Sequence, residues 1–250
     1  MAYLDAPPLA IAHRGGAAAG DENTAAAFEH AVKLGFRYVE TDVHATADGV
    51  PVVFHDATLV RLTGRQGRVD ALTAADLATV RVGGAAAIPR LDEILDAWPE
   101  IRFNIDVKSD AAVAPAVATI TATGARGRVL LASFSDSRLT RIRALAGPEV
   151  ATSLGRRTVT RLRLASLLPA AGPRLPASAV AAQVPARHGP LTVVDRRFLT
   201  LSHRLGLQVH VWTIDDPAEM RRLLDLGVDG IMTDRPEVLR DVYESRGLRL

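Results

Sequence analysis

The chain has 250 residues, of which 48% are hydrophobic and 23% charged, and its formal net charge is only +2. This length can bury one large core and leaves little room for a second full-sized domain. The composition excludes a disordered chain, and the balanced charge does not favour a nucleic-acid partner. With no cysteine, disulfides, thiolate metal ligands and thiol nucleophiles are excluded.

The N-terminus lacks the basic region and the apolar length of a signal peptide, and no later segment is apolar enough to span a bilayer. We therefore expect a cytoplasmic protein without stable membrane association. An arginine-rich segment, residues 155–164, could contact phosphates, but a solvated helix face is the simpler interpretation. The sequence carries no indication of the oligomeric state.

Short apolar runs alternate with amphipathic stretches along most of the chain. The runs predict strands at 9–13, 38–45, 102–108, 129–134, 150–154, 179–184, 207–214 and 228–233. The stretches between them include helical patterns at 23–35, 135–147, 195–206 and 216–227, each ending on a glycine suited to a helix C-cap. This alternation predicts an α/β fold, a (β/α)8 TIM barrel, with a doubly wound sheet as the alternative.

Two segments interrupt the alternation. A polar, glycine-containing stretch at about 56–90 is too long for an ordinary connection, and we expect a small insertion over the barrel mouth. The other is 157–176, where the helical pattern is arginine-rich and the next strand poorly defined. We expect one domain over residues 1–250 that includes the insertion.

Three carboxylates fall at the C-terminal ends of predicted strands, where barrels build active sites. Glu40 and Asp42 share one face of the second strand, and Asp106 lies at the end of the third, with Lys108 two residues on. Neighbouring carboxylates in an apolar setting repel each other unless a cation separates them or one is protonated. Their oxygens suit Mg²⁺ or Ca²⁺ better than Zn²⁺, while the alternative is that each acid pairs with an arginine.

Two histidines also close apolar, strand-like runs: His13 in "IAHRGG" and His55 in "VPVVFH". Each is expected at the barrel mouth, where an imidazole can exchange a proton near neutral pH. Arg14 supplies a guanidinium able to fork onto phosphate oxygens, and Lys108 a second cation. Together with a metal, these groups provide what cleavage of a phosphodiester requires.

The motifs taken together resemble those of the glycerophosphodiester phosphodiesterase family. They are "HRGG", "DENTAAAF" and "ETDVHATADGVPVVFHD", followed by "IPRLDEIL", "VWTIDD" and "GVDGIMTDRP". Each is weak alone, but their order and spacing are specific, and the resemblance runs from Ala10 almost to the C-terminus. It implies a TIM barrel with a small insertion after the second strand and metal-dependent hydrolysis of a glycerophosphodiester to sn-glycerol 3-phosphate and an alcohol.

The resemblance also implies roles for individual residues. His13 and His55 match the family's acid–base pair. Glu40 and Asp42 match its metal ligands, and Arg14 matches its phosphate contact. The family usually has Glu-x-Lys where this chain has an aspartate, Asp106, before Lys108, so the third ligand is one methylene shorter and could reach the metal through a water.

Further positions match the family at the mouth. Glu22 and Asn23 belong to the ENT element, and Glu22 would face the substrate, although Asn23 and Thr24 could simply cap the next helix. Trp212 matches an aromatic that would pack against the glycerol, with plain barrel core as the alternative. Phe134 could line the same pocket, again with plain barrel core as the alternative.

Other charged residues of the second strand and its loop are not assigned chemistry. His44 shares the face of the carboxylates and is interpreted as a rim residue, and Asp48 and Asp56 as turn or support residues. The sequence leaves open which histidine is the base, and whether water or the substrate's own 2-hydroxyl attacks.

Two alternative functions remain. A lysophospholipase D-like enzyme would need an apolar surface over the mouth, and the apolar residues of the insertion are few and interspersed. A non-catalytic barrel that binds a phosphate ligand is the other, because fold alone does not establish a reaction. Such a protein is expected to have lost a histidine or the Glu40/Asp42 pair, and both are present.

Overall fold

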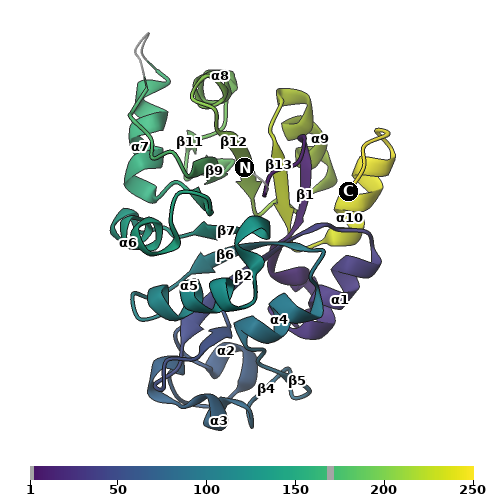
Figure 1. Cartoon of the computed structure of the whole chain (residues 1–250). Helices are drawn as coiled ribbons and strands as arrows, with labels where there is room; N and C mark the ends of the chain where they lie inside the picture. Colours follow the sequence, from purple (N-terminus) through teal and green to yellow (C-terminus); the bar gives the residue numbers. More distant parts are fainter. Residues whose placement is uncertain (1–2, 168–171) are drawn as a thin grey trace.

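Eight parallel strands close into a barrel because the first, β1, pairs with both β2 and β13 (Figure 1). The computed structural model describes residues 3–167 and 172–250, and within them the barrel strands are β1 (Leu9–Ala12), β2 (Tyr38–Ala45), β6 (Arg102–Val107), β7 (Val129–Ala132), β8 (Ala151–Ser153), β9 (Ala179–Pro185), β12 (Gln208–Trp212) and β13 (Gly230–Thr233). Each corresponds to a strand predicted from the sequence. The TIM barrel is confirmed, and closure rules out a doubly wound sheet.

Helices follow the strands and cover the outside of the barrel. They are α1 (Ala25–Lys33), α4 (Leu91–Ala97), α5 (Val113–Ala122), α6 (Asp136–Ala146), α7 (Arg156–Ala165), α8 (Arg196–Arg204), α9 (Pro217–Leu226) and α10 (Pro236–Glu244). The predicted helical patterns correspond to α1, α6, α8 and α9. Each of these four begins after a side chain that accepts a hydrogen bond from a backbone N–H of the first turn: Thr24, Ser135, Asp195 and Asp216.

Residues 56–90 fold as a separate small unit beyond the C-terminal end of β2 (Figure 1). This insertion follows β3 (Pro51–Val53), which runs antiparallel to β2, and contains α2 (Val60–Thr63), α3 (Ala74–Leu77), β4 (Arg81–Val82) and β5 (Ala86–Ala87). Together with the chain just before it, it buries its own apolar cluster, centred on Phe54, Leu59, Leu77 and Val82. The insertion is therefore anchored to the barrel through β3.

The remaining elements are short. A hairpin of β10 (Arg187–His188) and β11 (Leu191–Thr192) follows β9, and 3-10 turns lie at His13–Gly15, Ala17–Ala19, Val69–Ala71 and Ala125–Arg128. In the irregular segment 157–176, α7 is formed, while residues 168–171 lie outside the described residues. No helix in the described part of the chain is long and apolar enough to cross a membrane.

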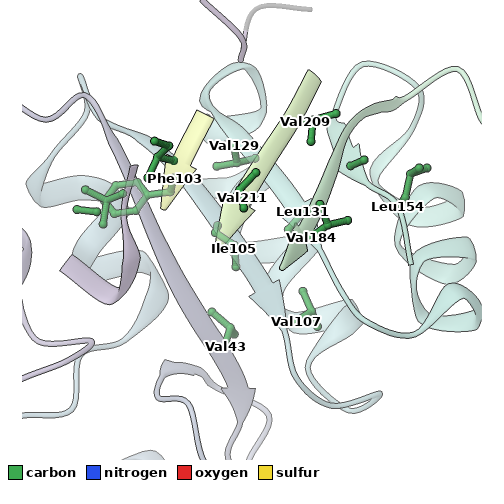
Figure 2. Packing of buried hydrophobic residues seen from close by; sticks show 14 of the residues in the cluster. Val43, Phe103, Ile105, Val107, Val129, Leu131, Leu154, Val184, Val209 and Val211 are labelled. Carbon is green, nitrogen blue, oxygen red and sulfur yellow. The ribbon is translucent and has the colours of Figure 1, made fainter. Parts of the chain in front are cut away.

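Alternation along the strands divides the core into two layers. Side chains such as Val43, Ile105, Leu131 and Val211 pack with the helices in the layer outside the barrel (Figure 2). The intervening residues point into the barrel, where a smaller apolar cluster includes Leu9, Ile11, Tyr38, Leu130 and Met232. On β2 and β6 this inner row continues toward the C-terminal end with polar side chains, which build the site.

The N-terminal segment closes the opposite end, the barrel floor. Tyr3 is buried there and its ring lies 5.5 Å from that of Tyr38, edge to face. The Tyr38 hydroxyl donates to the Tyr3 carbonyl at 2.9 Å and accepts from the Asp5 N–H at 2.8 Å. The barrel is thus open only at the C-terminal end of its strands, which is the polar mouth.

Candidate active site

Strand register places the predicted carboxylates side by side inside the barrel. In the parallel pairing of β2 and β6, Asp42 lies opposite Asp106 and Glu40 opposite Asn104. All four side chains are buried. Burial, and then the charge of Asp42, raise the pKa of Glu40 to about 7. The cluster is therefore electrostatically costly unless a cation balances it.

Two basic side chains supply part of that balance. Lys108 Nζ lies 2.7 Å from Asp42 Oδ1 and 2.6 Å from Asp106 Oδ2, and Arg14 Nε lies 3.1 Å from Asp42 Oδ2. Burial alone would raise the pKa of Asp42, but the Lys108 and Arg14 cations outweigh it, and the pKa is lowered. Asn104 Oδ1 and Asp106 Oδ1 are buried and have no hydrogen-bond partner among the described residues, so this row contains acceptors without a donor.

The turn after β1 brings Arg14 to this cluster. Arg14 has a φ of 55° and Gly15 a φ of 81°, both in the left-handed region. A Cβ on Gly15 would lie 2.7 Å from the Phe28 ring, so only glycine allows the turn to pack on α1. The Arg14 N–H then donates to Glu40 Oε2 at 3.2 Å. Strain of this kind is typical of functional sites.

From the sequence, Asn23 and Thr24 are candidates either for the mouth or for capping of the next helix, and each residue takes one of these roles. Thr24 caps α1, because its hydroxyl accepts from the Ala27 N–H. Asn23, with a φ of 60°, instead donates from Nδ2 to Asp42 Oδ2 at 2.8 Å and accepts from the Thr41 hydroxyl at 2.7 Å. Asn23 thus fixes the orientation of the Asp42 carboxylate.

Glu22 connects the barrel mouth to the insertion. It accepts from Arg14 Nη1 at 2.8 Å and from Arg61 Nη1 and Nη2 at 2.9 and 2.7 Å. Burial opposes ionisation of Glu22, but these two arginines overcome it and lower its pKa. Arg61, on α2, has no signal in the sequence that would have assigned it to the mouth.

His13 is held by an aspartate from the far end of the chain. Its Nδ1 lies 2.6 Å from Asp234 Oδ1, and its Nε2 lies 3.7 Å from Glu40 Oε2. Burial would lower the pKa of His13, but Glu40 and Asp234 together raise it. Asp234 follows β13 directly, so the rule that sites form at strand ends could have indicated it.

His55 is held in the same way by its neighbour. Its Nδ1 lies 2.6 Å from Asp56 Oδ1, while Asp56 Oδ2 accepts from Arg61 Nε at 2.6 Å. The bond from Arg61 is the main reason why the pKa of Asp56 falls to about 2. His44 is buried rather than at the rim, with Nε2 3.0 Å from the His55 carbonyl oxygen, and burial lowers its pKa. Asp56 supports His55, as interpreted from the sequence.

The two predicted aromatic residues meet at the mouth. The rings of Trp212 and Phe134 lie 5.6 Å apart at an interplanar angle of 79°. Trp212 ends β12 and is half-buried, whereas 49% of Phe134 is exposed. Phe134 therefore presents an aromatic surface to solvent beside the charged cluster.

Within the described residues, no three histidine, aspartate or glutamate side chains form a ready-made metal site. The mouth nevertheless gathers buried carboxylates, two basic side chains and two histidines with fixed Nδ1 atoms. In a TIM barrel, this arrangement defines a class of hydrolases that act on anionic esters.

Comparisons with known proteins place the chain within that class. The glycerophosphoryl diester phosphodiesterase family matches residues 13–238. The chain therefore belongs to this family, and it is a phosphoric diester hydrolase with glycerophosphodiester phosphodiesterase activity. The family resemblance seen in the sequence is confirmed.

Individual relatives agree with this assignment. A probable glycerophosphodiester phosphodiesterase of Mycobacterium tuberculosis is 41% identical over 242 residues, which cover 96% of this chain and 92% of the relative. A lysophospholipase D of Mus musculus is 30% identical over 92% of this chain and 84% of its own length. The crystal structure of a glycerophosphoryl diester phosphodiesterase from Silicibacter pomeroyi, described as putative, superposes with a TM-score of 0.81 at 25% identity, covering 99% of this chain and 96% of that one.

Proposed function

We propose that the mouth hydrolyses small glycerophosphodiesters to sn-glycerol 3-phosphate and an alcohol, with His13 and His55 as the acid–base pair. The observation that carries this proposal is the pairing of each imidazole, through Nδ1, with an aspartate at 2.6 Å. Because an ionised aspartate only accepts hydrogen bonds, Nδ1 carries a proton and Nε2 is left to exchange one with substrate. One imidazole takes a proton from the attacking group, which is water or the substrate's 2-hydroxyl, and the other gives a proton to the leaving alkoxide.

The basic side chains are proposed to bind the phosphate. Arg14 and Lys108 both contact Asp42, so a phosphate approaching that carboxylate meets two cations. Glu22 keeps Arg14 in place through the 2.8 Å bond to Nη1. Trp212, at the end of β12, would pack against the glycerol. Fixed cations of this kind stabilise the charge that develops on the phosphoryl oxygens without reorganising.

A divalent cation, Mg²⁺ or Ca²⁺, is proposed to bind at Glu40, Asp42 and Asp106. The donor set fits, since all three groups offer hard carboxylate oxygens and Asp106 Oδ1 is buried without a hydrogen-bond partner in the described residues. The raised pKa of Glu40 supports the same conclusion, because an added cation would relieve its repulsion with Asp42. Such an ion would neutralise charge on the bound phosphoryl group.

The activity is tested with a panel of four substrates: glycerophosphocholine, glycerophosphoethanolamine, glycerophosphoglycerol and a lysophospholipid, each with EDTA, Mg²⁺ or Ca²⁺. Product formation followed by ³¹P NMR separates sn-glycerol 3-phosphate from a cyclic phosphate, which would reveal attack by the 2-hydroxyl. We expect turnover of the glycerophosphodiesters with metal and none with EDTA. Lack of turnover of every glycerophosphodiester contradicts the proposal, and EDTA-insensitive activity removes the metal from it.

Metal binding is tested without turnover by thermal unfolding. We expect Mg²⁺ or Ca²⁺ to raise Tm, because a ligand that binds only the folded state stabilises it. The shift is expected to disappear in Glu40→Gln and Asp42→Asn, and to persist in the control Asp48→Asn, which alters an exposed acid of the loop after β2. An equal shift in all variants would place the ion elsewhere.

A lysophospholipase D activity is the second candidate. It is favoured by the Mus musculus relative and by the exposed ring of Phe134, which could contact an acyl chain. The lysophospholipid in the panel distinguishes the two candidates, since hydrolysis of it at rates matching the glycerophosphodiesters would extend the substrate class.

A further inference from the structure

Two cations of the protein itself lie near the Phe134 ring. Lys108 Nζ lies 5.9 Å from the ring centroid and the Arg156 guanidinium carbon 5.8 Å from it. Both lie within the distance at which a cation interacts with an aromatic ring. Since Lys108 also contacts the buried carboxylates, Phe134 connects the centre of the mouth to Arg156.

Arg156 is placed by the backbone rather than by an acid. It is the first residue of α7, and its N–H donates to the Phe134 carbonyl at 3.0 Å. Its side chain is exposed and forms no ion pair with any acid among the described residues. The nearby Asp136 carboxylate instead accepts from the N–H groups of Arg157 and Thr158 and from the Thr158 hydroxyl. Among the described residues, the Arg156 guanidinium therefore has no carboxylate bound to it.

We propose that Phe134 and Arg156 form a headgroup subsite that selects glycerophosphodiesters whose alcohol carries an anionic group, and disfavours a quaternary ammonium. This inference rests on the proposed function. An aromatic ring in a mouth would ordinarily attract a quaternary ammonium. Here two protein cations already lie near the Phe134 ring, so a third is repelled, whereas a phosphate or carboxylate gains an unpaired guanidinium able to bind it in a forked geometry.

Phe134 and Trp212 differ in how far they reach from the barrel. Trp212 lies at the end of β12, and its ring packs against that of Phe134 at 5.6 Å and an interplanar angle of 79°, with Phe134 the more exposed of the two. We assign the half-buried Trp212 ring to contact with the glycerol, and the exposed Phe134 ring to contact with the departing alcohol.

The test compares kcat/KM for three substrates: glycerophosphoinositol, its 4-phosphate and glycerophosphocholine. The first two differ by one phosphate group, so their ratio isolates the effect of charge. We expect the 4-phosphate to be preferred about fivefold over glycerophosphoinositol at low salt, as for an exposed ion pair, and the preference to shrink as salt is added. Glycerophosphocholine is expected to be the slowest of the three.

In Arg156→Gln the ratio is expected to fall to about one, while the matched control Arg157→Gln, an exposed arginine one residue further on α7, keeps the wild-type ratio. A ratio that is unchanged in Arg156→Gln, or a wild-type preference for glycerophosphocholine, overturns the subsite alone. Absence of turnover of all three substrates by the wild type contradicts the proposed function and the subsite with it. Because Arg156 is exposed, the variant is not expected to lose its fold.

Discussion

The two histidines of the mouth have the same partner type but are held by different parts of the molecule. His13 follows β1 and pairs with Asp234, which follows β13. The two residues are 221 positions apart in the sequence, but β1 and β13 are paired strands of the barrel. His55 pairs with the adjacent Asp56, whose other oxygen binds Arg61 of the insertion. The first pair therefore depends on closure of the barrel, and the second on docking of the insertion.

This difference affects how firmly each imidazole is fixed. The side chains of His13 and His55 are 14% and 32% exposed, respectively. Water can thus replace a lost partner more easily at His55. The two aspartates also differ in their ion pairs. Asp56 contacts both His55 and the Arg61 guanidinium, whereas in the described residues Asp234 makes an ion pair with His13 alone. We therefore expect the His13–Asp234 pair to be held more firmly than the His55–Asp56 pair.

The largest effect is expected from removing either imidazole. His13→Ala and His55→Ala should each reduce kcat by about 10²- to 10⁴-fold, the range typical of lost acid–base catalysis. His30→Ala, which removes an exposed histidine of α1 paired with Glu237, is the control and should keep wild-type kcat. Near-normal turnover in both folded variants would contradict the mechanism.

A smaller and unequal effect is expected from the aspartates. Asp234→Asn should lower kcat about 10²-fold, because an amide does not fix the Nδ1–H tautomer of His13, and Asp56→Asn only about tenfold. The loss is expected in kcat rather than KM, which steady-state kinetics separate. Equal losses in the two variants would show that the barrel and the insertion hold their histidines alike.

A still smaller effect is expected when the insertion is detached from the mouth. Arg61→Gln removes the bonds to Asp56 and Glu22, yet Glu22 keeps Arg14 and Asp56 keeps His55. We expect kcat/KM to fall about three- to tenfold, the scale of a partly exposed ion pair and its hydrogen bonds. Arg65→Gln, an exposed arginine of the same insertion, is the control. A loss as large as that of His55→Ala would instead make Arg61 part of the reaction itself.

The smallest effect on catalysis is expected from changes at the floor, which is remote from both histidine–aspartate pairs. The Tyr3 hydroxyl is buried with no hydrogen-bond partner in the described part of the chain, so Tyr3→Phe should change the free energy of unfolding by less than about 0.5 kcal/mol or increase it. Tyr38→Phe loses two hydrogen bonds and should cost about 1–3 kcal/mol. Denaturant unfolding measures both. A costly Tyr3→Phe would reveal a partner for that hydroxyl.

Much of the fold could be predicted because the signals are local. Each barrel strand is a short apolar run, and capping residues such as Thr24 and Asp195 lie directly before their helices. The alternation on β2 likewise placed Glu40 and Asp42 on one face, as the register with β6 confirms. The spacing of apolar residues and the capping of helices both depend on residues that are close in the chain, so a single sequence is enough to reveal them.

The parts that could not be predicted depend on pairing between distant segments. Asp234 becomes the partner of His13 only because β13 lies beside β1 in the closed barrel. Arg61 reaches Glu22 only because the insertion folds back over the mouth. Asp234 follows a strand end, where barrels build their sites, but no local pattern pairs it with His13, and none assigns Arg61 to the mouth.

The most direct test of the acid–base assignment uses a leaving group that needs no protonation. Turnover of glycerophosphoglycerol and of the p-nitrophenyl ester of sn-glycerol 3-phosphate would be compared in His13→Ala and His55→Ala. The mechanism predicts that the variant without the general acid regains activity on the p-nitrophenyl ester, while the variant without the base stays impaired on both substrates. Equal impairment of the two variants on both substrates, or full activity in either, would contradict a division of labour between the two histidines.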